Sequence, residues 1–157
     1  MSLYIVRGLP GAGKSKRASE LVDQLHCMLI EPDALLYQNG EYRYTPERYD
    51  WAWNACMHIL DAMYESSLKP DVVFADVLAS EREIVEVERQ YGEKAKKITT
   101  LEIDLATAKR RNVHGVSDDD LRAMAELFDK IEGDNAVIED AMDELKYEDV
   151  NDLPEGW

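Results

Sequence analysis

Short apolar runs alternate along this chain with longer segments in which apolar residues recur every three or four positions. The short runs predict buried strands at residues 3–7, 27–30, 71–76 and 98–103. The longer segments predict helices at residues 14–26, 46–63, 81–91 and 105–112. This alternation is typical of βαβ units, in which right-handed helical crossovers join parallel strands.

Capping residues mark where several of these helices begin and end. The predicted N-caps are Thr45, Ser80 and Ser117. Gly92 is a predicted helix stop, and Asn39-Gly40 predicts a turn in a loop or short hairpin that reaches Pro46. A helix is expected after Ser117, and residues 134–150 are also expected to be helical.

These elements predict an α/β fold, namely a doubly wound, mostly parallel sheet of four or five strands with helices on both faces and acidic helices at the C-terminus. The length of 157 residues suits a single domain. We divide it into a core of residues 1–133 and an acidic helical extension of the same domain, residues 134–157. Ligands bind beyond the carboxyl ends of the strands in such sheets. The positions of interest therefore begin at Gly8, Glu31, Asp76 and Asp104.

Composition narrows the class of protein. A hydrophobic content of 45% and a charged content of 32% are typical of a globular domain, and no apolar run is long enough to span a membrane. Cys27 and Cys56 form no disulfide framework, so we expect reduced thiols and a cytoplasmic protein. The net charge of −15 argues against non-specific binding of nucleic acid over the whole surface. Most of this excess lies from Asp118 onward, which leaves room for a positive cleft earlier in the chain.

The strongest motif follows the first predicted strand. Residues 8–15 match the G-x-x-x-x-G-K-[ST] pattern of a phosphate-binding loop (P-loop), and a predicted helix follows it as the motif requires. In such loops backbone N–H groups bind the phosphates; Lys14 would reach the β and γ phosphates, and Ser15 would bind Mg²⁺. We therefore expect ATP and Mg²⁺ as ligands. The predicted ATP-binding residues are Gly8, Leu9, Pro10, Gly11, Ala12, Gly13, Lys14, Ser15, Lys16, Arg110 and Arg111.

Two aspartates follow strands that should end beside this loop. Asp33 is the candidate general base, which would accept the proton of an acceptor hydroxyl; the alternative role is a helix cap. Asp76 ends an apolar strand, as a Walker B acid does, and would hold Mg²⁺ through water or orient the acceptor; the alternative is a loop or capping acid. The predicted catalytic residues are Lys14, Asp33, Asp76 and Arg111, and the predicted metal site is Ser15 with Asp76.

A basic segment and several aromatic residues are candidates for the rest of the site. Lys109-Arg110-Arg111 is expected to cover the phosphates as a lid, or else to compensate a helix dipole. Arg82, Tyr42 and His114 are candidate acceptor-binding residues. Aromatic residues around the Asn39-Gly40 turn would either stack on a nucleobase or pack the following helix; they are Tyr37, Tyr42, Tyr44, Tyr49, Trp51 and Trp53.

The order and spacing of these segments resemble the kinase domain of bacteriophage polynucleotide 5′-hydroxyl kinase and its P-loop relatives, which include zeta-toxin-like kinases. The matching segments lie between residues 3 and 131 and comprise residues 7–15, Asp33, 40–45, 74–76, 80–82 and 110–116, with the helix 121–128. The resemblance implies transfer of the γ-phosphate of ATP to a hydroxyl, with Asp33 as the base and Arg111 in the lid. Leu36 stands where the polynucleotide kinase carries an arginine.

Three functions remain open at this point. The first is an ATP-dependent kinase of a nucleic-acid or nucleotide hydroxyl, at a 5′ end or on a hydroxymethylated base, in the host cytoplasm if a phage encodes it. The second is a kinase of a small metabolite or sugar nucleotide, which suits Leu36 and the acidic surface. The third is a nucleotide-binding regulatory protein with little turnover, whose acidic C-terminal third would bind a partner. No membrane partner is expected, and no oligomeric state is predicted.

Overall fold

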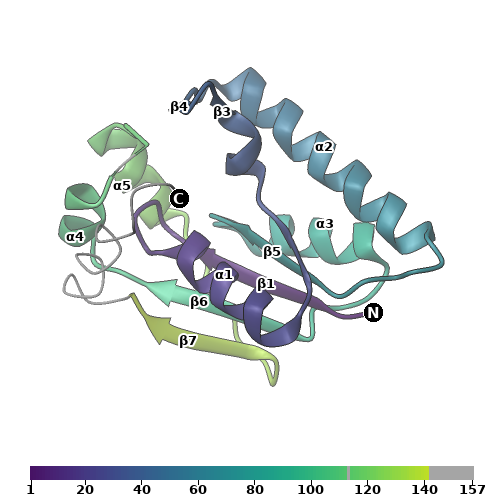
Figure 1. The fold of residues 1–157 in the computed structure, drawn as a ribbon. Helices are drawn as coiled ribbons and strands as arrows, with labels where there is room; N and C mark the ends of the chain where they lie inside the picture. The colour runs from purple at the N-terminus through teal and green to yellow at the C-terminus, as the bar shows by residue number, and fades with distance from the viewer. Residues whose placement is uncertain (113, 142–157) are drawn as a thin grey trace.

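The computed structural model describes residues 1–112 and 114–141 of the chain (Figure 1). Its core is a sheet of five parallel strands in the order β2-β5-β1-β6-β7. This arrangement confirms the predicted doubly wound α/β fold. The elements are β1 (Leu3–Gly8), α1 (Lys14–Leu25), β2 (Met28–Ile30), the 3₁₀ helix η1 (Pro32–Leu36), β3 (Tyr37–Gln38), β4 (Glu41–Tyr42), α2 (Pro46–Glu65), β5 (Val72–Asp76), α3 (Glu81–Tyr91), β6 (Lys97–Glu102), α4 (Leu105–Arg110), α5 (Asp118–Glu126) and β7 (Ala136–Asp140).

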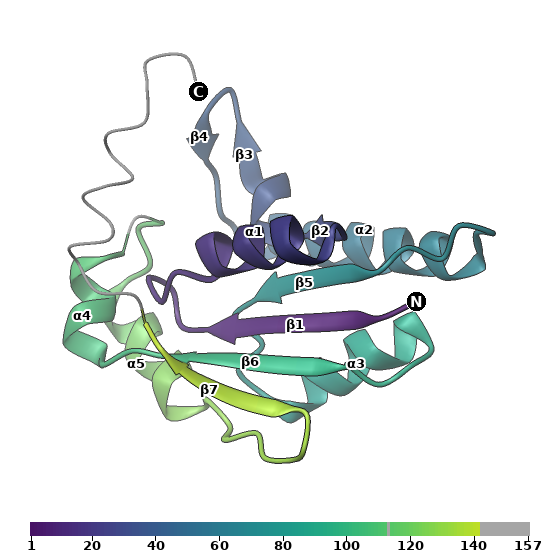
Figure 2. The same cartoon turned by 60° about the horizontal axis from the view of Figure 1, so that its bottom comes forward.

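Helices cover both faces of the sheet (Figure 2), and each face has its own apolar core. Side chains alternate between the faces along a strand, so neighbouring residues enter different cores. Ile5 and Phe74 pack with α2 and α3, whereas Val6 and Val73 pack with α1. Arg7 and Asp76 belong by this alternation to the α2 and α3 face, and both are buried.

The sequence-predicted caps and turn are confirmed. Thr45 and Ser80 cap α2 and α3 through their side chains, and Gly92 ends α3 with a φ of 82°. Asn39 and Gly40, with φ of 53° and 79°, form the turn between β3 and β4. That hairpin lies beside the start of α2, above one end of the sheet in Figure 2.

Two sequence-based expectations are wrong. Strand β2 is not a buried strand: it forms an edge of the sheet, and Met28 and Leu29 are 47% and 38% exposed. Residues 136–140 are not helical but form β7, which pairs in parallel with β6. The acidic composition of this segment favoured a helix. In the structure its Ala-Val-Ile run pairs instead with the edge of β6, because tertiary pairing overrides a weak local propensity. The remainder of the expected helical extension lies outside the described residues.

No helix in the described part of the chain has the length and apolar character needed to cross a membrane.

Candidate active site

The phosphate loop connects β1 to α1 at the carboxyl edge of the sheet. Gly11 and Gly13 have φ of 85° and 86°, a conformation that strains residues with a Cβ atom. A Cβ atom on Gly11 would lie 3.1 Å from the Ala108 carbonyl oxygen and 3.1 Å from the Arg111 Cβ. The end of α4 therefore packs directly on the loop, and the predicted lid segment lies beside it.

Lys14 lies at the start of α1 with three acidic side chains around it. Its Nζ donates a hydrogen bond to the Leu9 carbonyl oxygen at 3.1 Å. Burial lowers the pKa of Lys14, while the charges of Asp76, Asp33 and Glu31 act in the opposite direction. The structure thus brings the P-loop lysine together with both predicted catalytic aspartates.

Asp33 lies in η1 and faces the β3–β4 hairpin. Its Oδ1 accepts a hydrogen bond from the Tyr42 hydroxyl at 3.0 Å. Burial raises the pKa of Tyr42, so the hydroxyl stays protonated and acts as the donor. The Tyr42 ring packs against the His114 ring with centroids 4.2 Å apart. Three predicted site residues from separate segments therefore meet here.

Asp76 is a buried carboxylate at the end of β5. The Tyr49 hydroxyl of α2 donates to its Oδ2, and the Val77 N–H donates to its Oδ1 at 2.8 Å. Burial is the main cause that raises the pKa of Asp76 to about 6. Tyr49 was expected only as one of several aromatic residues, and its contact with Asp76 was not predicted.

Ser15 and Glu31 form a further pair beside the loop. The Ser15 hydroxyl donates to Glu31 Oε1 at 2.7 Å. Glu31 was not predicted as a binding residue, although its place directly after β2 marked it as a position of interest. Within residues 1–112 and 114–141 no three or more metal-ligating side chains form an ion site by themselves. A hydroxyl and nearby carboxylates fit Mg²⁺, which in such enzymes takes few protein ligands and completes its shell with phosphates and water.

The lid segment begins at the end of α4. Arg110 donates to Thr107 Oγ1 at 3.2 Å, and Thr107 Oγ1 donates to Asp104 Oδ2 at 2.7 Å. Asp104 also caps α4, because its carboxylate accepts from the Thr107 N–H. Beyond Arg111, Asn112 closes the loop through hydrogen bonds with both backbone groups of Val116. The predicted lid segment is therefore held at its base by α4, and its residue His114 contacts Tyr42.

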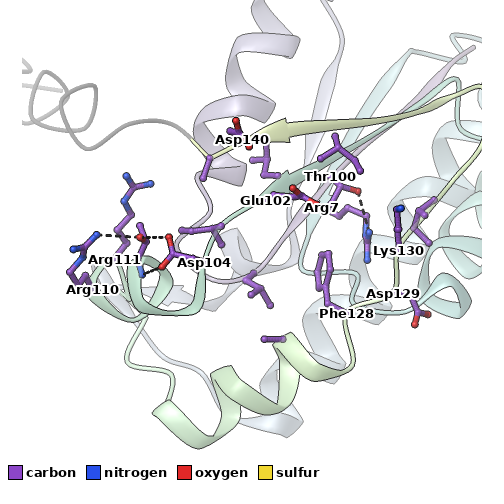
Figure 3. Close-up of a pocket in the computed structure, with 18 residues that line it drawn as sticks. Arg7, Thr100, Glu102, Asp104, Arg110, Arg111, Phe128, Asp129, Lys130 and Asp140 are labelled. Atoms are coloured by element: carbon purple, nitrogen blue, oxygen red, sulfur yellow. Dashed lines mark hydrogen bonds between the residues drawn. The ribbon is translucent and has the colours of Figure 1, made fainter.

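A cavity of about 890 Å³ lies on the other side of the phosphate loop, against β6 and β7 (Figure 3). Its lining includes Leu9 of the loop and the lid residues Arg110 and Arg111, but neither Lys14 nor the two aspartates. The polar and charged lining residues are Arg7, Thr100, Glu102, Asp104, Thr107, Arg110, Arg111, Asp129, Lys130 and Asp140.

Arg7 forms the inner wall of this cavity and was not predicted as a site residue. It donates to the Leu78 carbonyl oxygen at 2.9 Å and to Thr100 Oγ1 at 3.1 Å, and its guanidinium lies 3.9 Å from the centroid of the Phe128 ring. Burial lowers its pKa to about 10, which leaves it charged at neutral pH. These contacts tie β1 to the chain that follows Asp76, so Arg7 holds that segment in place.

Other predicted residues are more dispersed. Arg82 is exposed on the first turn of α3. Leu36 is 2% exposed in the core, so it presents no charge to an acceptor. Among the aromatic residues, Trp53 packs on Phe74 with ring centroids 5.7 Å apart, as the packing alternative predicts. Tyr37, Tyr44 and Trp51 are 51%, 51% and 59% exposed.

Comparison with known proteins gives a family and a set of similar folds. A family model described as an AAA domain matches residues 3–131. No curated protein matches this chain significantly.

Among solved structures, a gluconokinase from Sinorhizobium meliloti 1021 has a TM-score of 0.66 at 17% identity, covering 93% of this chain and 86% of that one. A sugar kinase from Janibacter sp. HTCC2649 has a TM-score of 0.62 at 14% identity, covering 94% and 89%. The Pnkp1/Rnl/Hen1 RNA repair complex contains a chain with a TM-score of 0.65 at 16% identity, covering 81% of this chain and 43% of that one. At these identities the likeness shows a shared fold alone.

Proposed function

Because this chain belongs to the AAA-domain family and has a P-loop kinase fold, we propose that it is an ATP-dependent kinase. It transfers the γ-phosphate to a hydroxyl of a nucleotide or nucleic acid. The observation that carries this proposal is the placement of Asp33: its carboxylate lies near enough for its charge to act on the P-loop lysine, and the Tyr42 hydroxyl fixes its orientation.

Asp33 acts as the general base in this proposal. An acceptor hydroxyl must lose a proton as it attacks the γ-phosphorus, and a positioned carboxylate accepts that proton. Lys14 holds the β and γ phosphates, and Arg111 stabilises the charge that develops on the transferred group. The position of Arg111 against Gly11 supports this role.

ATP would extend from the loop toward the cavity between β6, β7 and the lid. Leu9 of the loop and Arg111, which packs on Gly11, both line the cavity. ATP bound with its phosphates in the loop and its nucleoside in the cavity would pass these two residues. Ser15 and a neighbouring carboxylate would hold Mg²⁺, and the ion would neutralise the β and γ phosphates.

The exposed aromatic side chains favour a base-bearing acceptor. Tyr37 contacts Tyr42, and Tyr44 contacts Tyr49, so these two exposed rings each adjoin a tyrosine that donates a hydrogen bond to a site carboxylate. Aromatic faces stack on nucleobases with little dependence on their sequence. One structural neighbour belongs to an RNA repair complex, which is consistent with this choice.

A sugar or other small metabolite is the second candidate acceptor. Leu36 is buried and offers no cation for an acceptor phosphate, and two structural neighbours carry the names of sugar kinases.

Phosphate transfer from γ-labelled ATP with Mg²⁺ tests the proposal directly. The acceptors are 5′-hydroxyl DNA and RNA, hydroxymethyluracil DNA, nucleosides, nucleotides, sugar nucleotides and gluconate. The Asp33→Asn variant is compared with Asp23→Asn, which makes the same change at an exposed position on α1. Label in a base-bearing acceptor that disappears only in Asp33→Asn supports the proposal. Label only in gluconate or another sugar lacking a base would show that the acceptor is a sugar and not a nucleotide or nucleic acid. No label in any acceptor, with ATP still bound, would favour a nucleotide-binding regulatory protein.

A further inference from the structure

Glu31 and Asp33 are separated by one buried proline and turn toward different partners. Glu31 is the N-cap residue of η1, and its carbonyl oxygen accepts from the Ala34 N–H at 3.1 Å. Its side chain accepts from Ser15 at the phosphate loop, whereas the Asp33 side chain accepts from Tyr42 at the hairpin. The backbone of this short segment therefore holds one carboxylate at the phosphate loop and one at the β3–β4 hairpin.

The Ser15 hydroxyl has one proton and two lone pairs. When the proton is donated to Glu31, both lone pairs of Oγ stay available to a cation. A hydroxyl that ligates Mg²⁺ needs such an acceptor, because its proton must point away from the ion. The contact with Glu31 thus prepares Ser15 as a metal ligand.

Asp76 is the residue expected to serve the ion, and its charge acts on Lys14, but its hydrogen bonds come from other segments. Both of its oxygens accept hydrogen bonds from neutral donors, Tyr49 from α2 and the backbone of Val77. The ring of Tyr49 in turn packs against the ring of the exposed Tyr44. These contacts attach Asp76 to the acceptor side of the site.

We propose that Glu31 is the carboxylate that supports Mg²⁺ in this protein, by accepting the Ser15 proton while the Ser15 oxygen binds the ion. Asp76 is then a positioning residue of the acceptor side. This assignment rests on the proposed nucleotide-binding function. The assignment predicts that the effect of Mg²⁺ on nucleotide binding depends on Glu31, which follows β2, and not on Asp76, which ends β5.

Calorimetric titration of a non-hydrolysable ATP analogue, with Mg²⁺ and with EDTA, tests the assignment without requiring turnover. In the wild type we expect Mg²⁺ to tighten binding. In Glu31→Gln this tightening should fall by about tenfold or more, as is typical when a partner of a metal ligand is lost. Affinity in EDTA should stay equal or rise, because a negative charge near the phosphates has been removed. That second readout also shows that the variant is folded.

Three further variants sharpen the result. Ser15→Ala should lose the same tightening, and adding Glu31→Gln to it should cost little more, since the two side chains act as one unit. Asp76→Asn should keep most of the Mg²⁺ effect. Glu93→Gln is the matched control, an exposed glutamate in the loop before β6, and should behave as the wild type.

An unchanged Mg²⁺ effect in Glu31→Gln, or a loss confined to Asp76→Asn, would overturn the assignment while leaving the kinase proposal intact. A wild-type protein that binds no nucleotide in either buffer would instead overturn the proposed function itself.

Discussion

In the proposed function, the phosphate loop divides the site into a nucleotide side, toward β6 and β7, and an acceptor side, toward β2 and β5. The nucleotide side is shaped mainly by backbone: left-handed glycines turn the loop, and α4 packs on Gly11. The acceptor side is shaped by side chains, because tyrosine hydroxyls from the hairpin and from α2 hold the carboxylates of Asp33 and Asp76. A site shaped by backbone is little affected when side chains are substituted. The acceptor side, in contrast, depends on single hydroxyl groups that one substitution can remove. The two sides should therefore respond differently to substitution.

The largest expected effect separates the sides by function. Asp33→Asn should lower phosphate transfer by about 10²–10⁴-fold, because the proton acceptor is lost. Nucleotide affinity should stay within about threefold of the wild type, since the change lies on the acceptor side. Single-turnover transfer and equilibrium binding measure the two quantities. Full transfer activity in this variant would show that Asp33 is not the base.

The next effect concerns the free energy of unfolding and its dependence on pH. The pKa of Asp76 is about 6 in the folded protein, above its ordinary value of 3.8. The folded state therefore holds this proton more tightly, and stability falls as the pH rises from about 4 to about 6 and then levels off. The wild type should lose roughly 3 kcal/mol relative to Asp76→Asn over this interval. Urea unfolding of both proteins at pH 4 and pH 7 measures the difference, and parallel pH profiles would contradict the prediction.

Removing one hydroxyl should weaken the acceptor side by a smaller amount. Tyr49→Phe deletes the donor to Asp76 and should lower the free energy of unfolding by about 2 kcal/mol at pH 7, where Asp76 is charged. The loss should be smaller at pH 4, where the carboxyl group is protonated. Tyr64→Phe, at an exposed position near the end of α2, is the control for the substitution itself. Equal losses at both pH values would contradict a dependence on the charge of Asp76, and no loss at either pH would mean that Tyr49 contributes through its ring alone.

The smallest effect tests the backbone character of the nucleotide side. Gly11→Ala should lower the free energy of unfolding by about 1–2 kcal/mol, because the residue is held at positive φ. The added methyl group also meets α4, so nucleotide affinity should fall about tenfold or more. Gly40→Ala carries the same strain at a φ of 79° but meets no neighbour within 4 Å. It should match the loss of stability and spare nucleotide binding, and an equal loss of binding in both would contradict the argument.

Features that depend on residues close together in the chain could be predicted from the sequence, whereas features that depend on tertiary contacts could not. Local sequence patterns predict the P-loop, the caps at Thr45 and Ser80 and the turn at Asn39, because each of these features depends on residues close together in the chain. The contact between Tyr49 and Asp76 joins residues 27 positions apart and depends on how α2 lies over β5, which periodicity does not specify. Strand β7 was missed for a related reason, because its pairing with β6 is a tertiary interaction.

The contact between His114 and Tyr42 has a thermodynamic consequence. It joins the tip of the predicted lid to the β3–β4 hairpin, so a ligand that binds better with these rings together, or better with them apart, acts on both sides of the proposed site. A nucleotide that favours one of these states changes acceptor affinity by some factor, and the acceptor must change nucleotide affinity by that same factor. Binding of the nucleotide and binding of the acceptor would then be coupled, positively or negatively, even though the two substrates contact each other only through the transferred phosphate.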